Sequence, residues 1–170
     1  MNNIKAVIFD LDGTLIDSMG IWAQIDKEYL GNFGYAVPEN LQEEITHLTL
    51  TETAIYFKNK FNINDDIDKI ISTWHNMAFY HYSNTIKLKE GVIPYLDSLK
   101  KEGIKIALAT SNSVELLEAT LKNNNIYQYF DAITTTEDVK KSKDNPDIYL
   151  LSAKKLCIAP ENCLVFEDIV

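Results

Sequence analysis

Two aspartates, Asp10 and Asp12, close a short apolar run near the start of the chain and are followed by Gly13 and Thr14. Two carboxylates this close repel each other, and a divalent cation with oxygen ligands can supply the counter-charge. Gly13 permits a sharp turn that lets the backbone approach a ligand. The pattern therefore indicates a metal-assisted site, although a helix N-cap or an acidic turn would also explain it.

Three further groups of polar residues adjoin apolar runs or helical patterns later in the chain. They are Thr110, Ser111 and Asn112 after residues 104–109, Lys143 just before residues 146–156, and Glu167 with Asp168 after residues 163–166. A threonine hydroxyl can hydrogen-bond a phosphoryl oxygen, and a lysine can neutralise both a phosphoryl group and a nucleophile. The final acids can complete a magnesium shell. Taken singly, the three groups also fit a helix N-cap, a solvated basic loop and a plain turn.

The elements that must position these residues alternate between strand and helix. Short apolar runs predict strands at residues 6–9, 104–109, 163–166 and, more weakly, 130–133. Helical periodicity predicts helices at residues 92–101, 114–123 and 146–156. Such alternation is typical of an α/β fold with a Rossmann-like parallel sheet. Sheets of this kind bind ligands at the carboxyl ends of their strands, which is where the polar groups fall.

Residues 16–84 break the alternation, because they contain only helical patterns. These patterns cover residues 17–33, 39–47, 51–61 and 65–82. Four helices inserted after the first strand predict a separate, all-helical cap domain. We therefore expect a discontinuous catalytic core at residues 1–15 and 85–170, and a helical cap at residues 16–84.

The order of these motifs resembles the haloacid dehalogenase superfamily, in the branch with a helical cap after the first strand. Asp10-Leu11-Asp12-Gly13-Thr14 matches its first motif, Thr110 its second, Lys143 its third, and Glu167-Asp168 its fourth. The nearest subgroup is that of the β-phosphoglucomutase-like phosphatases. Lys143-Asp144-Asn145-Pro146-Asp147 stands where that subgroup has Lys-Pro-x-Pro-Asp, so Asp144 replaces the first proline.

The resemblance implies a Mg²⁺-dependent phosphatase that forms an aspartyl-phosphate intermediate on Asp10, with Asp12 as general acid and base. The substrate would be a small phosphorylated metabolite, with a sugar phosphate as the default. Further implied catalytic residues are Thr110 and Lys143; implied phosphate-binding residues are Gly13, Thr14, Ser111 and Asn112. Implied metal ligands are Asp10, the backbone carbonyl of Asp12, Glu167 and Asp168.

Three alternatives remain open. A sugar-phosphate mutase of the same fold needs two cationic side chains to hold a bisphosphate. Here Glu52 stands where the mutase has a cap arginine, and the segment Ser111-Asn112-Ser113-Val114 after Thr110 lacks the lysine that the mutase has there. A signalling receiver domain also phosphorylates an aspartate, but it lacks a helical insertion and uses an aspartate on a later strand. The third alternative is an inactive truncated fragment or a binding protein.

The composition argues against some classes of binding partner. The formal net charge of −9 argues against binding to nucleic acid or to an anionic membrane surface. We expect a cytoplasmic protein without a membrane span, with Cys157 and Cys163 as buried thiols rather than zinc ligands.

The sequence ends at Val170, whereas the family normally continues with a helix, a strand and a closing helix. We therefore expect the core to lack its C-terminal part and to expose one sheet edge. The chain would then be a monomer or a weak dimer through that edge.

Overall fold

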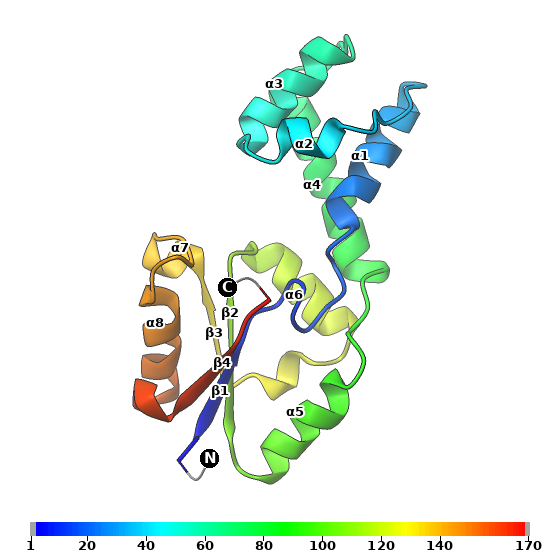
Figure 1. Cartoon of the computed structure of the whole chain (residues 1–170). Coiled ribbons are helices and arrows are strands. Elements are labelled where there is room, and N and C mark those ends of the chain that lie inside the picture. Colours follow the sequence, from blue (N-terminus) through cyan, green and yellow to red (C-terminus); the bar gives the residue numbers. More distant parts are fainter. Residues whose placement is uncertain (1–2, 169–170) are drawn as a thin grey trace. The chain divides into compact units, whose positions relative to one another are not determined.

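The computed structural model describes residues 3–168, and the chain separates into two compact units (Figure 1). The described residues of one unit are 3–19 and 82–168, and the other unit spans residues 20–81. The expected core and cap boundaries lie a few residues away from these limits. Their assignment as catalytic core and substrate-selecting cap stays a prediction.

The first unit contains a four-stranded parallel sheet in the order β3-β2-β1-β4. The strands are β1 (Ala6–Phe9), β2 (Lys105–Thr110), β3 (Ala132–Thr135) and β4 (Cys163–Phe166). The expected α/β class with a parallel sheet is therefore confirmed. Because all pairings are parallel, the carboxyl ends of the four strands share one edge of the sheet.

Helices cover both faces of this sheet. Figure 1 shows α7 and α8 on one side of it and α5 and α6 on the other. The helices are α5 (Val92–Lys101), α6 (Val114–Asn123), α7 (Thr136–Val139) and α8 (Asp147–Leu156), with short 3₁₀ turns at η1 (Tyr127–Tyr129) and η2 (Pro160–Asn162). Ile8, Ala107 and Ala109 belong to a buried cluster that includes Ile148 and Ala153 of α8. The small alanines let this helix lie close to the central strands.

Three strands differ from the sequence expectation. β2 spans Lys105–Thr110 rather than residues 104–109. β3 begins at Ala132 rather than at residue 130 and extends to Thr135, because the buried Thr134 and Thr135 continue the strand although they are polar. The apolar run of β4 is typical of a strand buried on both faces, but β4 is an edge strand within the described residues, in agreement with the expected exposed sheet edge. Leu164 and Val165 are 40% and 39% exposed.

The expectation of buried thiols is also wrong. Cys157 is exposed and Cys163 is partly exposed. Cys157 has a φ of +58° at the C-cap of α8, where a left-handed residue ends the helix. Neither cysteine forms a disulfide among the described residues.

The second unit is helical. Its elements are α1 (Ile21–Asn32), α2 (Leu41–Ile45), α3 (Leu50–Lys60) and α4 (Ile67–Asn84), whose last residues belong to the first unit. Tyr29, Phe57 and Trp74 pack together, with ring centroids 5.0 Å apart for Phe57 and Trp74. Helix α1 begins later than expected. The segment before it pairs with residues that follow α4: the Asp17 amide donates to the Lys87 carbonyl, and Ile16 forms an isolated bridge with Leu88.

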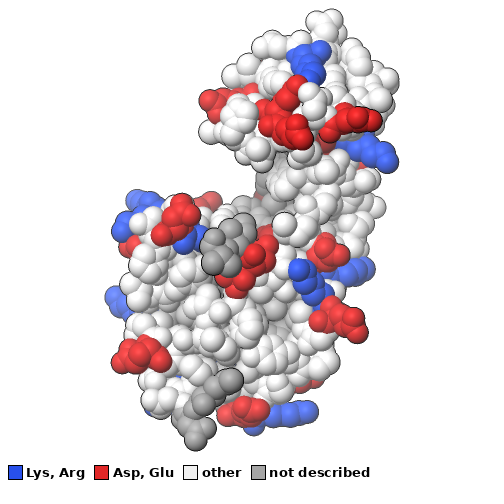
Figure 2. Space-filling view, viewed as in Figure 1, with Lys and Arg blue, Asp and Glu red and all other residues white. Residues whose placement is uncertain are grey.

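On the face drawn in Figure 2, basic side chains of the described residues lie singly or in small groups rather than in one continuous area. Between residues 3 and 168, no helix combines the length and apolar character that crossing a bilayer requires.

Candidate active site

The loop after β1 is fixed by its own backbone. The Gly13 amide donates to the Ile16 carbonyl, and the Leu15 and Ile16 amides both donate to the Leu11 carbonyl. Gly13 has a φ of +80°, which favours glycine, and its carbonyl accepts a hydrogen bond from the Lys89 ammonium. This loop begins at Asp10, whose amide donates to the Phe166 carbonyl on β4.

Asp10 is a buried carboxylate with a cation against it. The residue is 4% exposed, and the Lys143 ammonium donates to its Oδ1 atom. Lys143 also donates to Oε2 of Glu167, at 2.8 Å, and the same oxygen accepts from the Tyr149 hydroxyl at 2.8 Å. Burial raises the pKa of Asp10 to about 6, although Lys143 opposes the shift.

Three acids can hold a metal ion here. Asp10, Glu167 and Asp168 each offer a carboxylate oxygen, and these oxygens lie within 4.8 Å of one another. The Oδ2 atom of Asp10 is buried and has no hydrogen-bond partner among the described residues. Oxygen-only ligands around a buried, unsatisfied carboxylate suit a hard cation such as Mg²⁺. The residues present therefore fit the expected ion.

The Asp12 carboxylate accepts hydrogen bonds from three side chains. Its Oδ1 atom accepts hydrogen bonds from the Ser18 hydroxyl, at 2.6 Å, and from the Tyr82 hydroxyl. Its Oδ2 atom accepts from the Asn112 side-chain amide at 2.9 Å. The sequence predicts that Asn112 binds phosphate. In the structure its side-chain amide donates to Asp12.

Two predicted hydroxyl groups lie at the end of β2 and in the loop after β1. Thr110 ends β2, is buried, and its Oγ1 atom accepts from the Asn112 amide at 3.0 Å. The Thr14 hydroxyl is buried and has no partner among the described residues. Both hydroxyls can therefore still donate a proton to an oxygen of a bound phosphoryl group.

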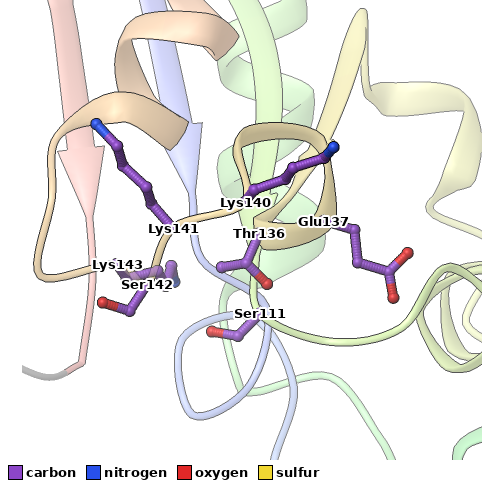
Figure 3. A pocket seen from close by; sticks show the side chains of 7 residues that line it. All are labelled: Ser111, Thr136, Glu137, Lys140, Lys141, Ser142 and Lys143. Atoms are coloured by element: carbon purple, nitrogen blue, oxygen red, sulfur yellow. The ribbon is translucent and has the colours of Figure 1, made fainter.

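A pocket of about 440 Å³ lies beside Lys143 in the first unit (Figure 3). Its lining residues are Ser111, Thr136, Glu137, Lys140, Lys141, Ser142 and Lys143. Figure 3 shows the Lys140 and Lys141 side chains diverging from each other. Lys141 is paired with Asp147 at 2.7 Å, whereas Lys143 connects the pocket to Asp10. All of its lining residues are polar or charged, and its volume is that of a small-metabolite site.

Sequence reasoning missed four residues that contact this site: Ser18, Tyr82, Lys89 and Tyr149. The helical pattern places Tyr82 in a cap helix, and Tyr149 is the third residue of α8. None of the four stands in a motif, and only their contacts in the fold identify them. A search for polar residues in the first turn of the helix that follows Lys143 could have found Tyr149.

Replacing Gly13 with alanine should disable the site. An alanine Cβ would overlap the Asp168 carboxylate, lie 2.9 Å from the Met19 sulfur, and force a side chain into φ +80°. We expect at least roughly a hundredfold loss of phosphate-ester turnover and about 1–3 kcal/mol of destabilisation. Thermal unfolding and initial rates would measure both effects.

Gly91→Ala is the matched control, because Gly91 has a φ of +84° but has nothing within 4 Å of the point that an alanine Cβ would occupy. It carries the backbone strain without the clash. Equal losses of turnover in the two variants would contradict the importance of the close approach between Gly13 and Asp168.

Comparison with known proteins places these motifs in a family. The model of the haloacid dehalogenase-like hydrolases matches residues 7–170. A phosphorylated carbohydrates phosphatase from Thermotoga maritima is 30% identical over 165 residues, covering 97% of this chain and 76% of that protein. YhcW from Bacillus subtilis, proposed to be a phosphatase, is 31% identical and covers 98% of this chain and 76% of its own.

A solved structure agrees with this placement. The crystal structure of a Thermotoga maritima protein proposed to be a β-phosphoglucomutase superposes with a TM-score of 0.89 at 30% identity. The match covers 97% of this chain and 76% of that one.

Proposed function

The chain belongs to the haloacid dehalogenase-like hydrolases and is a phosphatase of that family, and we propose that it hydrolyses sugar phosphates through an aspartyl-phosphate on Asp10. The observation that carries the proposal is the buried Asp10 carboxylate, which lies against Lys143 and beside Glu167 and Asp168. A nucleophile, a cation and metal ligands at the ends of parallel strands are what phosphoryl transfer requires.

In the first step, a carboxylate oxygen of Asp10 bonds to phosphorus while the bond from phosphorus to the ester oxygen breaks. The electron pair goes to the leaving oxygen, which takes a proton from Asp12. In the second step, Asp12 takes a proton from a water molecule while the water oxygen attacks phosphorus and the bond from phosphorus to the Asp10 oxygen breaks. This step frees Asp10 and releases inorganic phosphate.

The surrounding residues stabilise the negative charge of the transferring group. Lys143 donates to the reacting carboxylate, and the Thr110 and Thr14 hydroxyls would donate to phosphoryl oxygens. Mg²⁺ held by Asp10, Glu167 and Asp168 would neutralise further charge on the phosphoryl oxygens when bound. Preorganised charge of this kind supplies most of the rate in phosphoryl transfer.

The choice of sugar phosphates rests on two supports. The first is the pocket beside Lys143, whose lining residues include hydroxyl and ammonium groups that can bind a hydroxylated, anionic ligand. The second is the phosphatase of Thermotoga maritima, which is named for phosphorylated carbohydrates.

A mutase is the second candidate, because the solved structure at a TM-score of 0.89 is proposed to be a β-phosphoglucomutase. Glu52 stands where the mutase would have a cationic side chain that binds the second phosphate, and here it caps the N-terminus of its own helix. Its carboxylate accepts from the Thr49 amide at 2.8 Å and completes a capping box at the start of α3. An anion in that place favours hydrolysis over retention of a bisphosphate.

The proposal predicts phosphate release that depends on Mg²⁺. Turnover of hexose 6-phosphates and p-nitrophenyl phosphate should fall at least roughly a hundredfold in EDTA and return with added Mg²⁺, because three close carboxylates need a counter-ion. The measurement is inorganic phosphate release over a panel of sugar phosphates.

A mutase would give a different result in the same assay. It would interconvert hexose 1-phosphate and hexose 6-phosphate only when primed with a hexose bisphosphate, without net phosphate release. Turnover unaffected by EDTA would contradict the metal assignment.

A further inference from the structure

The carboxylate of Asp12 is oriented by residues from three separate segments. Ser18 follows the catalytic loop, Asn112 follows β2, and Tyr82 lies in the last turn of α4. Tyr82 is also the first residue of the sheet-containing unit after the helical one. The acid–base group is thus tied to the point where the chain returns from the helical unit.

The pattern of donors selects one oxygen of Asp12. A carboxylate has about four acceptor sites, two on each oxygen. Among residues 3–168, Oδ1 accepts from both Ser18 and Tyr82, whereas Oδ2 accepts from Asn112 alone. The remaining acceptor site therefore lies on Oδ2. Without the two hydroxyls, the carboxylate could rotate and present either oxygen.

Tyr82 is well suited to be a permanent donor. Its side chain is 3% exposed, which fixes the ring. Burial, and then the negative charge of Asp12, raise the pKa of Tyr82, so the phenol keeps its proton throughout the neutral range.

We propose that Tyr82 is a positioning residue, which together with Ser18 fixes Oδ1 of Asp12 so that proton transfer with the substrate proceeds through Oδ2. The inference rests on the proposed function, in which Asp12 protonates the leaving oxygen. It assigns to a residue of α4 a part in chemistry that the motifs alone do not reveal.

Loss of the positioning of Asp12 should affect substrates differently, according to how basic their leaving group is. A sugar alkoxide is a strong base and leaves only as it takes the proton of Asp12, whereas p-nitrophenolate is a weak base and leaves without it. Misplacing the proton therefore slows sugar phosphate cleavage but spares cleavage of p-nitrophenyl phosphate. General acid catalysis contributes roughly 10²- to 10⁴-fold, and partial misplacement forfeits part of that factor.

The test is Tyr82→Phe, which removes one oxygen from a buried ring. We expect kcat/KM for a hexose 6-phosphate to fall roughly 10- to 100-fold, and the rate of p-nitrophenolate release in the first turnover to change less than about threefold. Ser18→Ala removes the other donor to the same oxygen and should shift the ratio of the two rates in the same direction. It keeps the test decisive if Tyr82→Phe folds poorly.

Two comparisons separate positioning from a structural effect. Asp12→Asn should show the same selectivity for leaving group, and adding Tyr82→Phe to it should leave the ratio unchanged. Tyr80→Phe alters an exposed tyrosine on the same helix and should leave both rates as in the wild type.

Equal losses on both substrates, or independent effects of Tyr82→Phe and Asp12→Asn, would overturn the proposal. Failure of the proposed function would look different, because the unmodified protein would then release no phosphate in Mg²⁺.

Discussion

Asp10→Asn is expected to lower Mg²⁺-dependent phosphate release by roughly 10⁴-fold or more. Asparagine keeps the shape of the side chain but has no anionic oxygen to bond to phosphorus. Because Asp10 is also one of three close carboxylates, the change would remove a proposed metal ligand together with the proposed nucleophile. Initial rates with a sugar phosphate and with p-nitrophenyl phosphate would measure the loss.

The same change should stabilise the metal-free fold above pH 6. The pKa of Asp10 is raised by burial from its usual value of 3.8 to about 6, so the folded protein resists its ionisation. The stability that protonated Asp10 contributes is fully present below pH 3.8 and is lost as pH rises through about 6. At pH 7.5 in EDTA, the ionised group costs on the order of 1–3 kcal/mol, which asparagine avoids.

Thermal unfolding in EDTA at pH 4 and pH 7.5 would measure this effect. We expect Asp10→Asn to raise Tm at pH 7.5 by a few degrees and to change it less at pH 4. Asp17→Asn is the control, because Asp17 is an exposed acid next to the same loop. A variant that kept wild-type turnover would contradict the assignment of Asp10 as nucleophile.

The sequence allows the residues at the strand ends to be predicted because the fold itself brings them together. Asp10, Thr110 and Glu167 lie far apart in the chain, but each stands at the end of a parallel strand, at the same edge of the sheet. Once the alternation of strand and helix predicts such a sheet, the proximity of these side chains follows. Lys143 lies in a loop before α8, and its position is predicted by the motif rather than by the geometry.

The rest could not be predicted because it depends on tertiary contacts without a local pattern. Tyr82 reads as a helical residue in the sequence, and nothing in its neighbours indicates that its hydroxyl reaches Asp12, 70 residues away. Tyr149 likewise contacts Glu167 only because α8 packs on the sheet. The expected end of β3 is wrong because burial of Thr134 and Thr135 outweighs their polarity, which a hydrophobic pattern cannot register.

Lys143→Met is expected to separate turnover from metal binding. Methionine preserves much of the side-chain length and removes the ammonium that contacts both Asp10 and Glu167. Turnover should fall roughly 10³-fold, because a preorganised cation no longer stabilises the charge of the transferring phosphoryl group. Mg²⁺ should bind more tightly, since the cation that competes for the same carboxylates is gone.

The opposite signs make the Lys143→Met prediction specific. Calorimetric titration with Mg²⁺ would give the affinity, and initial rates at saturating Mg²⁺ would give the turnover. Lys122→Met is the control, because Lys122 pairs with Glu118 on the exposed face of α6 and should change neither quantity. If Lys143→Met weakened Mg²⁺ binding and turnover together, its role would be to hold the loop in shape. If Mg²⁺ bound more tightly while turnover collapsed, Lys143 would be acting through its charge on the reacting phosphoryl group.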